Sequence, residues 1–213
     1  MKPLNWFAAS EQGWQERFRE LRGQLLAPLL RILTRCGVRP NWVSVTGLLI
    51  LIPFTWLFLR SPGPEAALWA LVPLLAHLVL DGIDGPLARY QGRLGSAGSI
   101  VDMACDHLAF AWVCITLVHV ELLHRTWGCL YILFYTLAVV QLVLLNQFAR
   151  PFKVVLRTKF VLYGLVAIYG LTGWNGLNVM VPLCLASEVS TCLLAFLRIY
   201  RILAEQPAAS RPE

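Results

Sequence analysis

Four aspartates stand close together in the middle of an otherwise apolar sequence, and their spacing could build a cation site. Asp81 and Asp84 are three residues apart, and Asp102 and Asp106 are four residues apart. Residues at these spacings share one face of a helix. Two helices packed through such faces would gather four carboxylates in one pocket. Carboxylates in an apolar setting repel one another and suit hard divalent cations, so we expect Mg²⁺ or Mn²⁺ before zinc.

An acidic metal pocket is a natural place for a phosphate group, and the residues around the aspartates favour that interpretation. Acid pairs at helical spacing near a membrane surface are more often solvated or ion-paired helix ends. Here the acids come with Arg89, and with Gly85 and Gly98 at positions where a Cβ atom could block a close ligand. The combination favours a binding site over a solvated helix end.

The same segment resembles the signature of the CDP-alcohol phosphotransferases, the class I CDP-alcohol phosphatidyltransferase family. All eight fixed positions of that signature match over 26 residues: Asp81, Asp84, Gly85, Ala88, Arg89, Gly98, Asp102 and Asp106. The resemblance implies transfer of a phosphatidyl, or other substituted phosphoryl, group from a CDP-linked lipid such as CDP-diacylglycerol to an alcohol, with release of CMP.

The resemblance also implies roles for the acidic residues. Asp81, Asp84 and Asp102 would hold one or two divalent ions against the donor diphosphate. Asp106 would act as the general base on the acceptor hydroxyl and could also touch a second metal ion. Asp81 counts among the donor-binding residues as well.

Donor binding by the remaining residues of the signature follows from the same resemblance. Arg89 is expected on the donor phosphates, and Gly85, Ala88 and Gly98 are expected to form a floor of small residues beneath the cytidine.

The segment from Pro40 to Ser44 resembles the entry to the first membrane span in this family. Asn41 and Ser44 are therefore expected near the nucleotide, although a helix cap explains them equally well.

A cluster of basic residues provides a candidate site for the phosphate of a phosphorylated acceptor, of the glycerol 3-phosphate or inositol phosphate type. Its members are Arg150, Lys153, Arg157, Lys159 and Arg198. Anionic lipid is the more common partner of such clusters, and an unphosphorylated acceptor stays open. His107, which follows Asp106, is interpreted as a solvated neighbour, a hydrogen-bond partner or an acceptor contact, and the first is favoured. For Glu188 and His77 we expect structural hydrogen bonds.

Composition places the whole chain in a membrane. The 213 residues are 58% hydrophobic and 14% charged, with a mean hydropathy of +0.64, which excludes an ordinary soluble domain. We predict an all-α integral membrane protein with six transmembrane helices preceded by an amphipathic juxtamembrane helix. The predicted spans are residues 42–58, 66–87, 99–123, 127–148, 160–174 and 177–202.

The predicted domains are a juxtamembrane segment (1–40), the six-helix membrane domain (41–203) and a tail (204–213). Within the first segment, apolar residues recur at helical spacing between Glu11 and Cys36, and Gly37 and Pro40 end that helix. Its apolar face comprises Trp14, Phe18, Leu21, Leu25, Leu29 and Ile32.

Charge distribution predicts the orientation. With the amino end in the cytoplasm, 16 of the 18 Lys and Arg residues face inward, and only Arg60 and Arg125 face outward. The acidic motif then faces the cytoplasm from a cell inner or plasma membrane. The net charge of +6 thus reflects one membrane face and does not indicate nucleic-acid binding.

Other features narrow the function classes. The six cysteines form no CxxC pair and are expected as core residues. No signal peptide is expected at the amino terminus, and the resemblance implies a homodimer. Two competing functions remain, a cation transporter and a lipid-binding relative without catalytic activity. A transporter would normally carry its acids at mid-membrane in broken helices, and a noncatalytic relative would be expected to lack one of the four acids.

Overall fold

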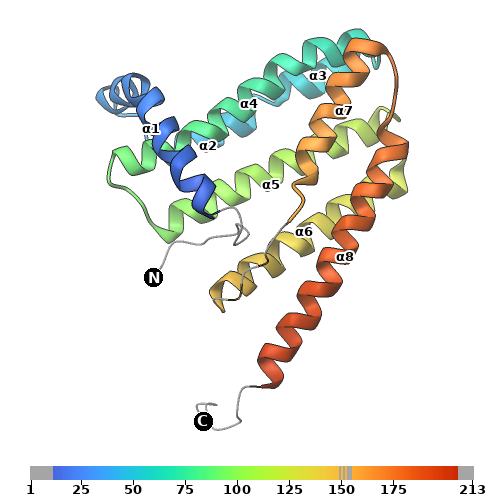
Figure 1. Cartoon of the computed structure of the whole chain (residues 1–213). Coiled ribbons are helices and arrows are strands. Elements are labelled where there is room, and N and C mark those ends of the chain that lie inside the picture. The colour runs from blue at the N-terminus through green and yellow to red at the C-terminus, as the bar shows by residue number, and fades with distance from the viewer. Residues whose placement is uncertain (1–11, 149, 151, 153–154, 206–213) are drawn as a thin grey trace.

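The computed structural model describes residues 12–148, 150, 152 and 155–205. These residues form an all-helical assembly without strands (Figure 1). Its helices are α1 (Gln12–Arg35), α2 (Pro40–Leu49), α3 (Ile52–Arg60), α4 (Pro64–Tyr90), α5 (Ser96–His119), α6 (Arg125–Gln147), α7 (Thr158–Thr172) and α8 (Leu177–Ala204).

Five segments of the described chain are long and apolar enough to cross a membrane. They are Pro40–Arg60, Pro64–Tyr90, Ala97–His119, Arg125–Gln147 and Leu177–Ala204. The protein is therefore an integral membrane protein. Of the six predicted spans, the fifth corresponds to α7, an apolar helix of only 15 residues. At 1.5 Å per residue it covers about 22 Å, which is less than the hydrocarbon core of about 30 Å.

The first predicted span is divided into two helices. α2 ends at Leu49 and α3 begins at Ile52, with Pro53 in its first turn. Proline has no N–H, so Pro53 cannot make the helical hydrogen bond to the carbonyl group four residues earlier, and the helix is interrupted just before it. Both helices pack along α4.

The helices pack in a layered bundle with one main apolar core. α4 contacts α2, α3 and α7, α5 contacts α2 and α6, and α6 packs closely along α8, as Figure 1 shows. Large side chains fill the core completely; examples are Phe54, Phe58, Phe110 and Tyr131. α5 thus runs through the middle of the bundle and can present side chains to both α2 and α6.

α1 ends as the sequence predicts, at a left-handed glycine. Gly37 has φ 72°, its N–H donates to Thr34 O at 3.0 Å, and Val38 N–H donates to Leu33 O at 3.0 Å. This is the Schellman arrangement, which satisfies the last carbonyl groups of a helix. It fixes the direction in which the chain enters α2.

One face of α1 packs on the bundle and another is exposed. Leu30 is buried against Val43 of α2 and Leu87 of α4. Leu25 and Ile32 are exposed by 73% and 58%, so this predicted apolar face does not pack on the described protein. The side chains of Trp14, Phe18 and Leu21, and residue Glu11, lie outside the described part.

Candidate active site

The four aspartates lie at matching depths in two neighbouring helices. α4 ends at Tyr90 and α5 begins at Ser96, so both helix ends meet at one side of the bundle. Counted from those ends at 1.5 Å per residue, the acids of both helices lie about 9 to 15 Å into the bundle. The predicted helical faces are therefore real, and the acids stand below one edge of the protein.

Asp84 is the most deeply held of the four, with 4% of its surface exposed. Its Oδ2 accepts a hydrogen bond from Ser44 Oγ at 2.7 Å, and its Oδ1 accepts one from the Gly85 N–H at 2.6 Å. Ser44 belongs to α2, so the bond ties the entry helix to the acidic motif. The structure thus brings Ser44 to the acidic motif, and its predicted place near the nucleotide stays a prediction.

Asp102 connects the two helices electrostatically. Its carboxyl group is within hydrogen-bonding reach of the Asp84 carboxyl group, and the charges of Asp81 and Asp106 act on it as well. Like charges this close in an apolar setting destabilise one another. Any cation that enters the cluster therefore stabilises it.

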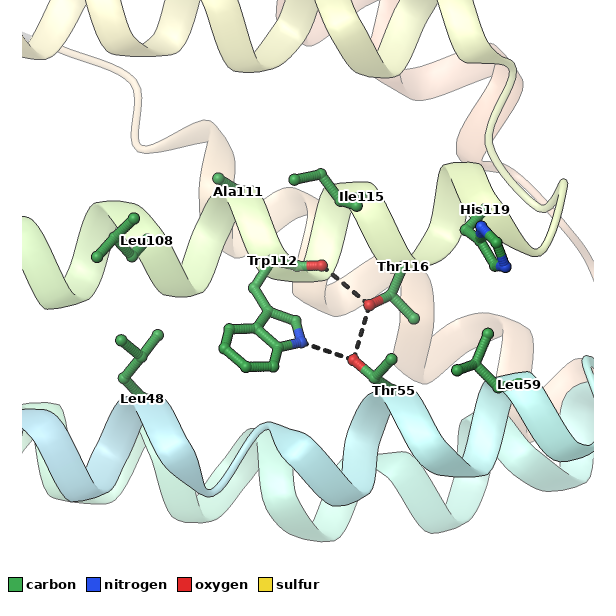
Figure 2. Close-up of a pocket in the computed structure, with 9 residues that line it drawn as sticks. All are labelled: Leu48, Thr55, Leu59, Leu108, Ala111, Trp112, Ile115, Thr116 and His119. Carbon is green, nitrogen blue, oxygen red and sulfur yellow. Dashed lines mark hydrogen bonds between the residues drawn. The ribbon is translucent and has the colours of Figure 1, made fainter.

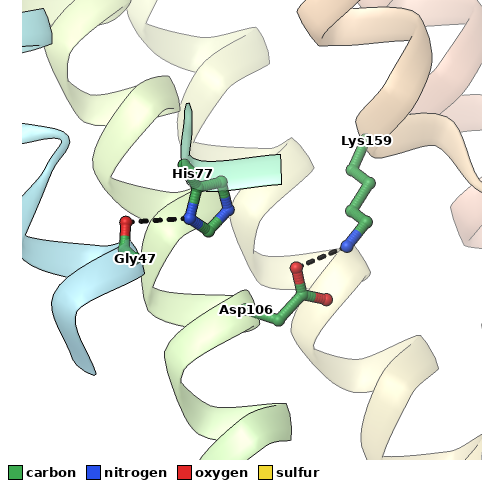
Figure 3. Close-up of polar contacts among 4 residues, drawn as sticks. All are labelled: Gly47, His77, Asp106 and Lys159. Atoms are coloured by element: carbon green, nitrogen blue, oxygen red, sulfur yellow. Dashed lines mark hydrogen bonds and ion pairs between the residues drawn. The ribbon is translucent and has the colours of Figure 1, made fainter. Parts of the chain in front are cut away.

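A lysine from a distant part of the chain supplies one such cation. Lys159, at the start of α7, donates from Nζ to Asp106 Oδ1 in an ion pair (Figure 3). The side chains of Lys159 and Asp106 are exposed by only 8% and 21%. The pair joins α7 to α5 at Asp106, the acid furthest from the helix ends.

His77 lies beside this ion pair. It sits one turn before Asp81 on α4, is 2% exposed, and its Nδ1 is 2.9 Å from the carbonyl oxygen of Gly47. With a carbonyl as partner, Nδ1 must carry the proton. Figure 3 shows the ring between Gly47 and the Asp106–Lys159 pair. The predicted structural hydrogen bond of His77 is confirmed, and the second ring nitrogen, Nε2, is buried without a hydrogen-bond partner.

The predicted donor-binding glycines lie near the end of α4 (Gly85) and the start of α5 (Gly98). A Cβ atom at Gly98 would be 3.8 Å from Asn41 Oδ1, and one at Gly85 would be 3.7 Å from Arg89 Nη1. Both distances are ordinary van der Waals contacts. The structure therefore groups Asn41 with Gly98 and Arg89 with Gly85, while Ala88 is half-buried one turn after Asp84.

The predicted basic cluster is divided in the structure. Lys159 is turned inward to Asp106, whereas Arg150 and Arg157 are exposed and the Arg198 guanidinium lies 5.7 Å from the centre of the Phe152 ring. Lys153 lies outside the described residues. Sequence reasoning grouped these residues by proximity along the chain and missed the inward ion pair, because no local pattern links positions 106 and 159.

His107 acts as a hydrogen-bond partner, whereas the sequence favoured a solvated neighbour. Its Nε2 lies 2.8 Å from Thr136 Oγ1 of α6, and its ring stacks on Tyr135 with 5.6 Å between centroids. The expectation of a solvated neighbour is therefore wrong. His107 belongs to α5 and contacts α6, because α5 is packed between α2 and α6.

Glu188 obtains the partner that the sequence predicts for a buried acid. The residue is 4% exposed, and its Oε1 accepts a hydrogen bond from Thr158 Oγ1 at 2.6 Å. Thr158 is the first residue of α7 and directly precedes Lys159. The bond therefore anchors the end of α7 that delivers Lys159 to Asp106.

Removal of this anchor should loosen α7. We expect Thr158→Val, which keeps the shape but removes the donor, to cost about 1–3 kcal/mol because a buried carboxyl group loses its partner. A lower midpoint of thermal unfolding in detergent would report it. Thr172→Val on the same helix is the control, since Thr172 is exposed and its hydroxyl bonds only local backbone groups, Ile168 O and the Trp174 N–H. Equal midpoints for the two variants would contradict the anchor.

The donor set suits a hard divalent cation, although the side chains are not yet arranged around one. Carboxylate oxygens are the preferred ligands of Mg²⁺ and Mn²⁺, and the clustered charge of Asp81, Asp84, Asp102 and Asp106 favours a cation. Within the described residues, no group of three or more His, Cys, Asp or Glu side chains stands in metal-holding geometry. Each Asp84 oxygen accepts one hydrogen bond and keeps a second lone pair that could bind a cation.

Fold and site together define an integral membrane protein in which two neighbouring helices, α4 and α5, carry four carboxylates near one end of the bundle. The family comparison is specific for this architecture. The family model described as CDP-alcohol phosphatidyltransferase matches residues 38–196, which include α2 to α7 and most of α8. The chain belongs to the CDP-alcohol phosphatidyltransferase family.

Curated relatives match over shorter stretches. A cardiolipin synthase (CMP-forming) of Streptomyces coelicolor is 39% identical over 71 residues, 32% of this chain and 33% of its own length. The inner membrane protein YnjF of Escherichia coli is 36% identical over 92 residues (42% and 41%), and a phosphatidylinositol phosphate synthase of Mycobacterium marinum is 35% identical over 89 residues (38% and 34%). The matches span only about a third to two fifths of these relatives.

Proposed function

We propose that this protein transfers a phosphatidyl group from CDP-diacylglycerol to the hydroxyl group of a small polar alcohol and releases CMP, in phospholipid synthesis. The observation that carries the proposal is the convergence of the family's signature acids from α4 and α5, with Ser44 bonded to Asp84 and Lys159 paired with Asp106. Two matched relatives are named as synthases of phospholipids, one of them CMP-forming.

In this proposal the residues of the site divide the work by position. Asp81, Asp84 and Asp102 hold one or two divalent ions, and Asp106 also lies within reach of the second. Bound Mg²⁺ or Mn²⁺ supplies positive charge against the donor's diphosphate. Arg89, at the exposed end of α4, binds a donor phosphate through its planar guanidinium group.

Asp106 is the catalytic residue of the proposal. A carboxylate that faces the acceptor can take the hydroxyl proton as the oxygen attacks the phosphorus atom. Lys159 orients that carboxylate through its ion pair. The His77 ring lies between Gly47 and the Asp106–Lys159 pair (Figure 3). It limits the positions that the two charged side chains can adopt.

The donor-binding role of the glycines gives a direct prediction. We expect Gly85→Ala to lower CDP affinity by at least tenfold, about 1.4 kcal/mol, because the added methyl group occupies the surface on which the cytidine lies. Folding should be preserved, since the new Cβ would meet only Arg89 Nη1 at 3.7 Å. Calorimetric titration of the purified protein with CDP and Mg²⁺ measures the change.

Gly164→Ala is the matched control for this prediction. Gly164 is exposed on α7 with nothing within 4 Å of the position that a Cβ would take. Its CDP affinity should equal that of the wild type. If Gly85→Ala binds CDP as well as Gly164→Ala does, the assigned cytidine floor is wrong.

The acceptor proposed here is a phosphorylated alcohol of the glycerol 3-phosphate or inositol phosphate type. Arg150 and Arg157 are exposed near the start of α7, and Arg198 reaches the same region from α8. Their guanidinium groups suit a phosphate ester. Lys153 and Lys159 stay in the proposed acceptor set from the sequence, with Lys159 paired to Asp106. An unphosphorylated acceptor with the same chemistry is the second candidate.

One assay separates these functions. Purified protein is supplied with CDP-diacylglycerol, Mg²⁺ or Mn²⁺, and each of glycerol 3-phosphate, inositol phosphate, glycerol and inositol, and CMP is measured. Turnover with the phosphate esters alone supports the proposal. Turnover with the free alcohols alone would support the second candidate. If none of the acceptors raises CMP release above the Asp106→Asn background, a non-enzymatic cation- or lipid-binding protein remains.

The remaining features of the proposal concern the membrane. The active site faces the cytoplasm, in agreement with the asymmetry of the Lys and Arg residues, and α1 lies along that surface with its exposed apolar residues in the lipid. α7 crosses as a sixth, short span where the bilayer thins locally. The protein functions as a homodimer.

A further inference from the structure

A separate apolar pocket of about 490 Å³ opens between α5 and the α2–α3 pair (Figure 2). Its volume is in the range of ligand sites. The lining residues are Leu48, Thr55, Leu59, Leu108, Ala111, Trp112, Ile115, Thr116 and His119. None of the four signature acids contributes to it.

The few polar groups of the pocket bond to one another. Trp112 Nε1 donates to Thr55 Oγ1 at 2.6 Å, Thr55 and Thr116 share a hydrogen bond of 2.8 Å, and Thr116 Oγ1 donates to Trp112 O at 3.0 Å. Figure 2 shows this network between the two walls. Because these three side chains satisfy one another, the walls around them offer little to a polar ligand and suit a hydrocarbon chain. His119, at the far end, is the remaining polar side chain of the lining and is exposed.

The pocket lies along the half of α5 that is away from the acidic motif. Along α5 it runs from Leu108 to His119, about 16 Å at 1.5 Å per residue. Asp106 precedes this stretch, so the pocket occupies the half of α5 that lies away from the acidic motif. α3 runs to the same far end, where Leu59 lines the pocket.

The far end also carries groups suited to a phospholipid headgroup. Arg60 follows Leu59 directly, is exposed, and its guanidinium lies 5.3 Å from the Trp56 ring centre. Exposed Trp and Arg together are typical of the membrane interface. Glu65 in the first turn of α4 and the Glu121–Arg125 ion pair balance the charges at this end. Arg60 therefore contributes a guanidinium group for a headgroup phosphate and no net positive charge.

We propose that this pocket holds one acyl chain of a phospholipid from the leaflet opposite the acidic motif. The headgroup lies by Arg60 and His119, and the chain extends toward Leu108 and Leu48. The chain fills the space left by the break between α2 and α3 and supports α5, the helix that carries Asp102 and Asp106. The lipid is a resident ligand and is distinct from the CDP-lipid donor.

Photo-crosslinking on the wild-type protein tests the direction of the chain. The probes are two phosphatidylglycerols in phosphatidylcholine vesicles, one with a diazirine near the headgroup and one with a diazirine near the chain end. The first should label residues near Leu59 and His119, and the second should label residues near Leu48 and Leu108. Reversed order would mean that the chain enters from the acidic side, and equal labelling of exposed α8 would mean bulk lipid only; either result overturns the proposal.

Occlusion of the pocket tests its occupancy. Ala111→Phe should reduce pocket labelling about tenfold, whereas Ala186→Phe, at an exposed position of α8, should leave it unchanged. Competition by unlabelled CDP-diacylglycerol should also leave it unchanged. Displacement by that donor, or a native mass spectrum in which a second copy of the chain closes the pocket of the wild type in place of lipid, would refute the proposal whatever the transferase assay gives.

Discussion

Asp106→Asn should lower CMP release by about a thousandfold, within the range of 10² to 10⁴ for general bases. The amide cannot accept the proton of the acceptor hydroxyl, yet its oxygen can still accept the hydrogen bond from Lys159. CDP binding should therefore be largely retained, so the loss falls on turnover. Parallel measurements of turnover and CDP affinity on the purified protein separate the two effects.

An exposed acid just beyond the other end of α5 provides the control for this prediction. Glu121 follows α5 and pairs only with Arg125 at the surface, so Glu121→Gln should retain wild-type turnover. Asp106→Asn activity within tenfold of the wild type would remove the catalytic role of Asp106. A parallel loss of CDP binding would instead assign Asp106 chiefly to donor or metal binding.

Lys159→Met should both destabilise the protein and abolish most of its activity. The substitution leaves the Asp106 carboxylate without its cation beside three other acids. Removal of one partner from a buried pair typically costs about 3–5 kcal/mol. A lower midpoint of thermal unfolding in detergent, together with reduced CMP release, would report both consequences.

A double variant separates charge from catalysis. Lys159→Met combined with Asp106→Asn removes the uncompensated charge, so its unfolding midpoint should recover toward the wild type. Its activity should stay as low as that of Asp106→Asn alone. If the double variant is no more stable than Lys159→Met, the ion pair contributes little, and Lys159 acts through another contact.

Local spacing was sufficient to predict which aspartates share a helix face. Offsets of three and four residues placed Asp81 with Asp84 and Asp102 with Asp106, because helix geometry fixes which residues share a face. The five long apolar spans followed from length and hydropathy in the same way. The Gly37 cap also depends on local chemistry, and it too was predicted.

Contacts between distant segments could not be predicted. The pairs Lys159–Asp106 and Thr158–Glu188 join positions 53 and 30 residues apart, and only the packing of α7 against its neighbours brings them together. The same limit explains His107, which a neighbouring helix holds. The division of the first span at Pro53 was available as a local signal, but a continuous apolar run masked it.

The most direct test of the site is an experimental structure with Mn²⁺ and CDP-diacylglycerol in which anomalous scattering locates the metal. The proposed function predicts an anomalous peak between the donor diphosphate and the carboxylates of Asp81, Asp84 and Asp102, with Asp106 facing the space for the acceptor. A bound donor whose diphosphate lies away from these four acids, or manganese held elsewhere in the protein, would contradict it.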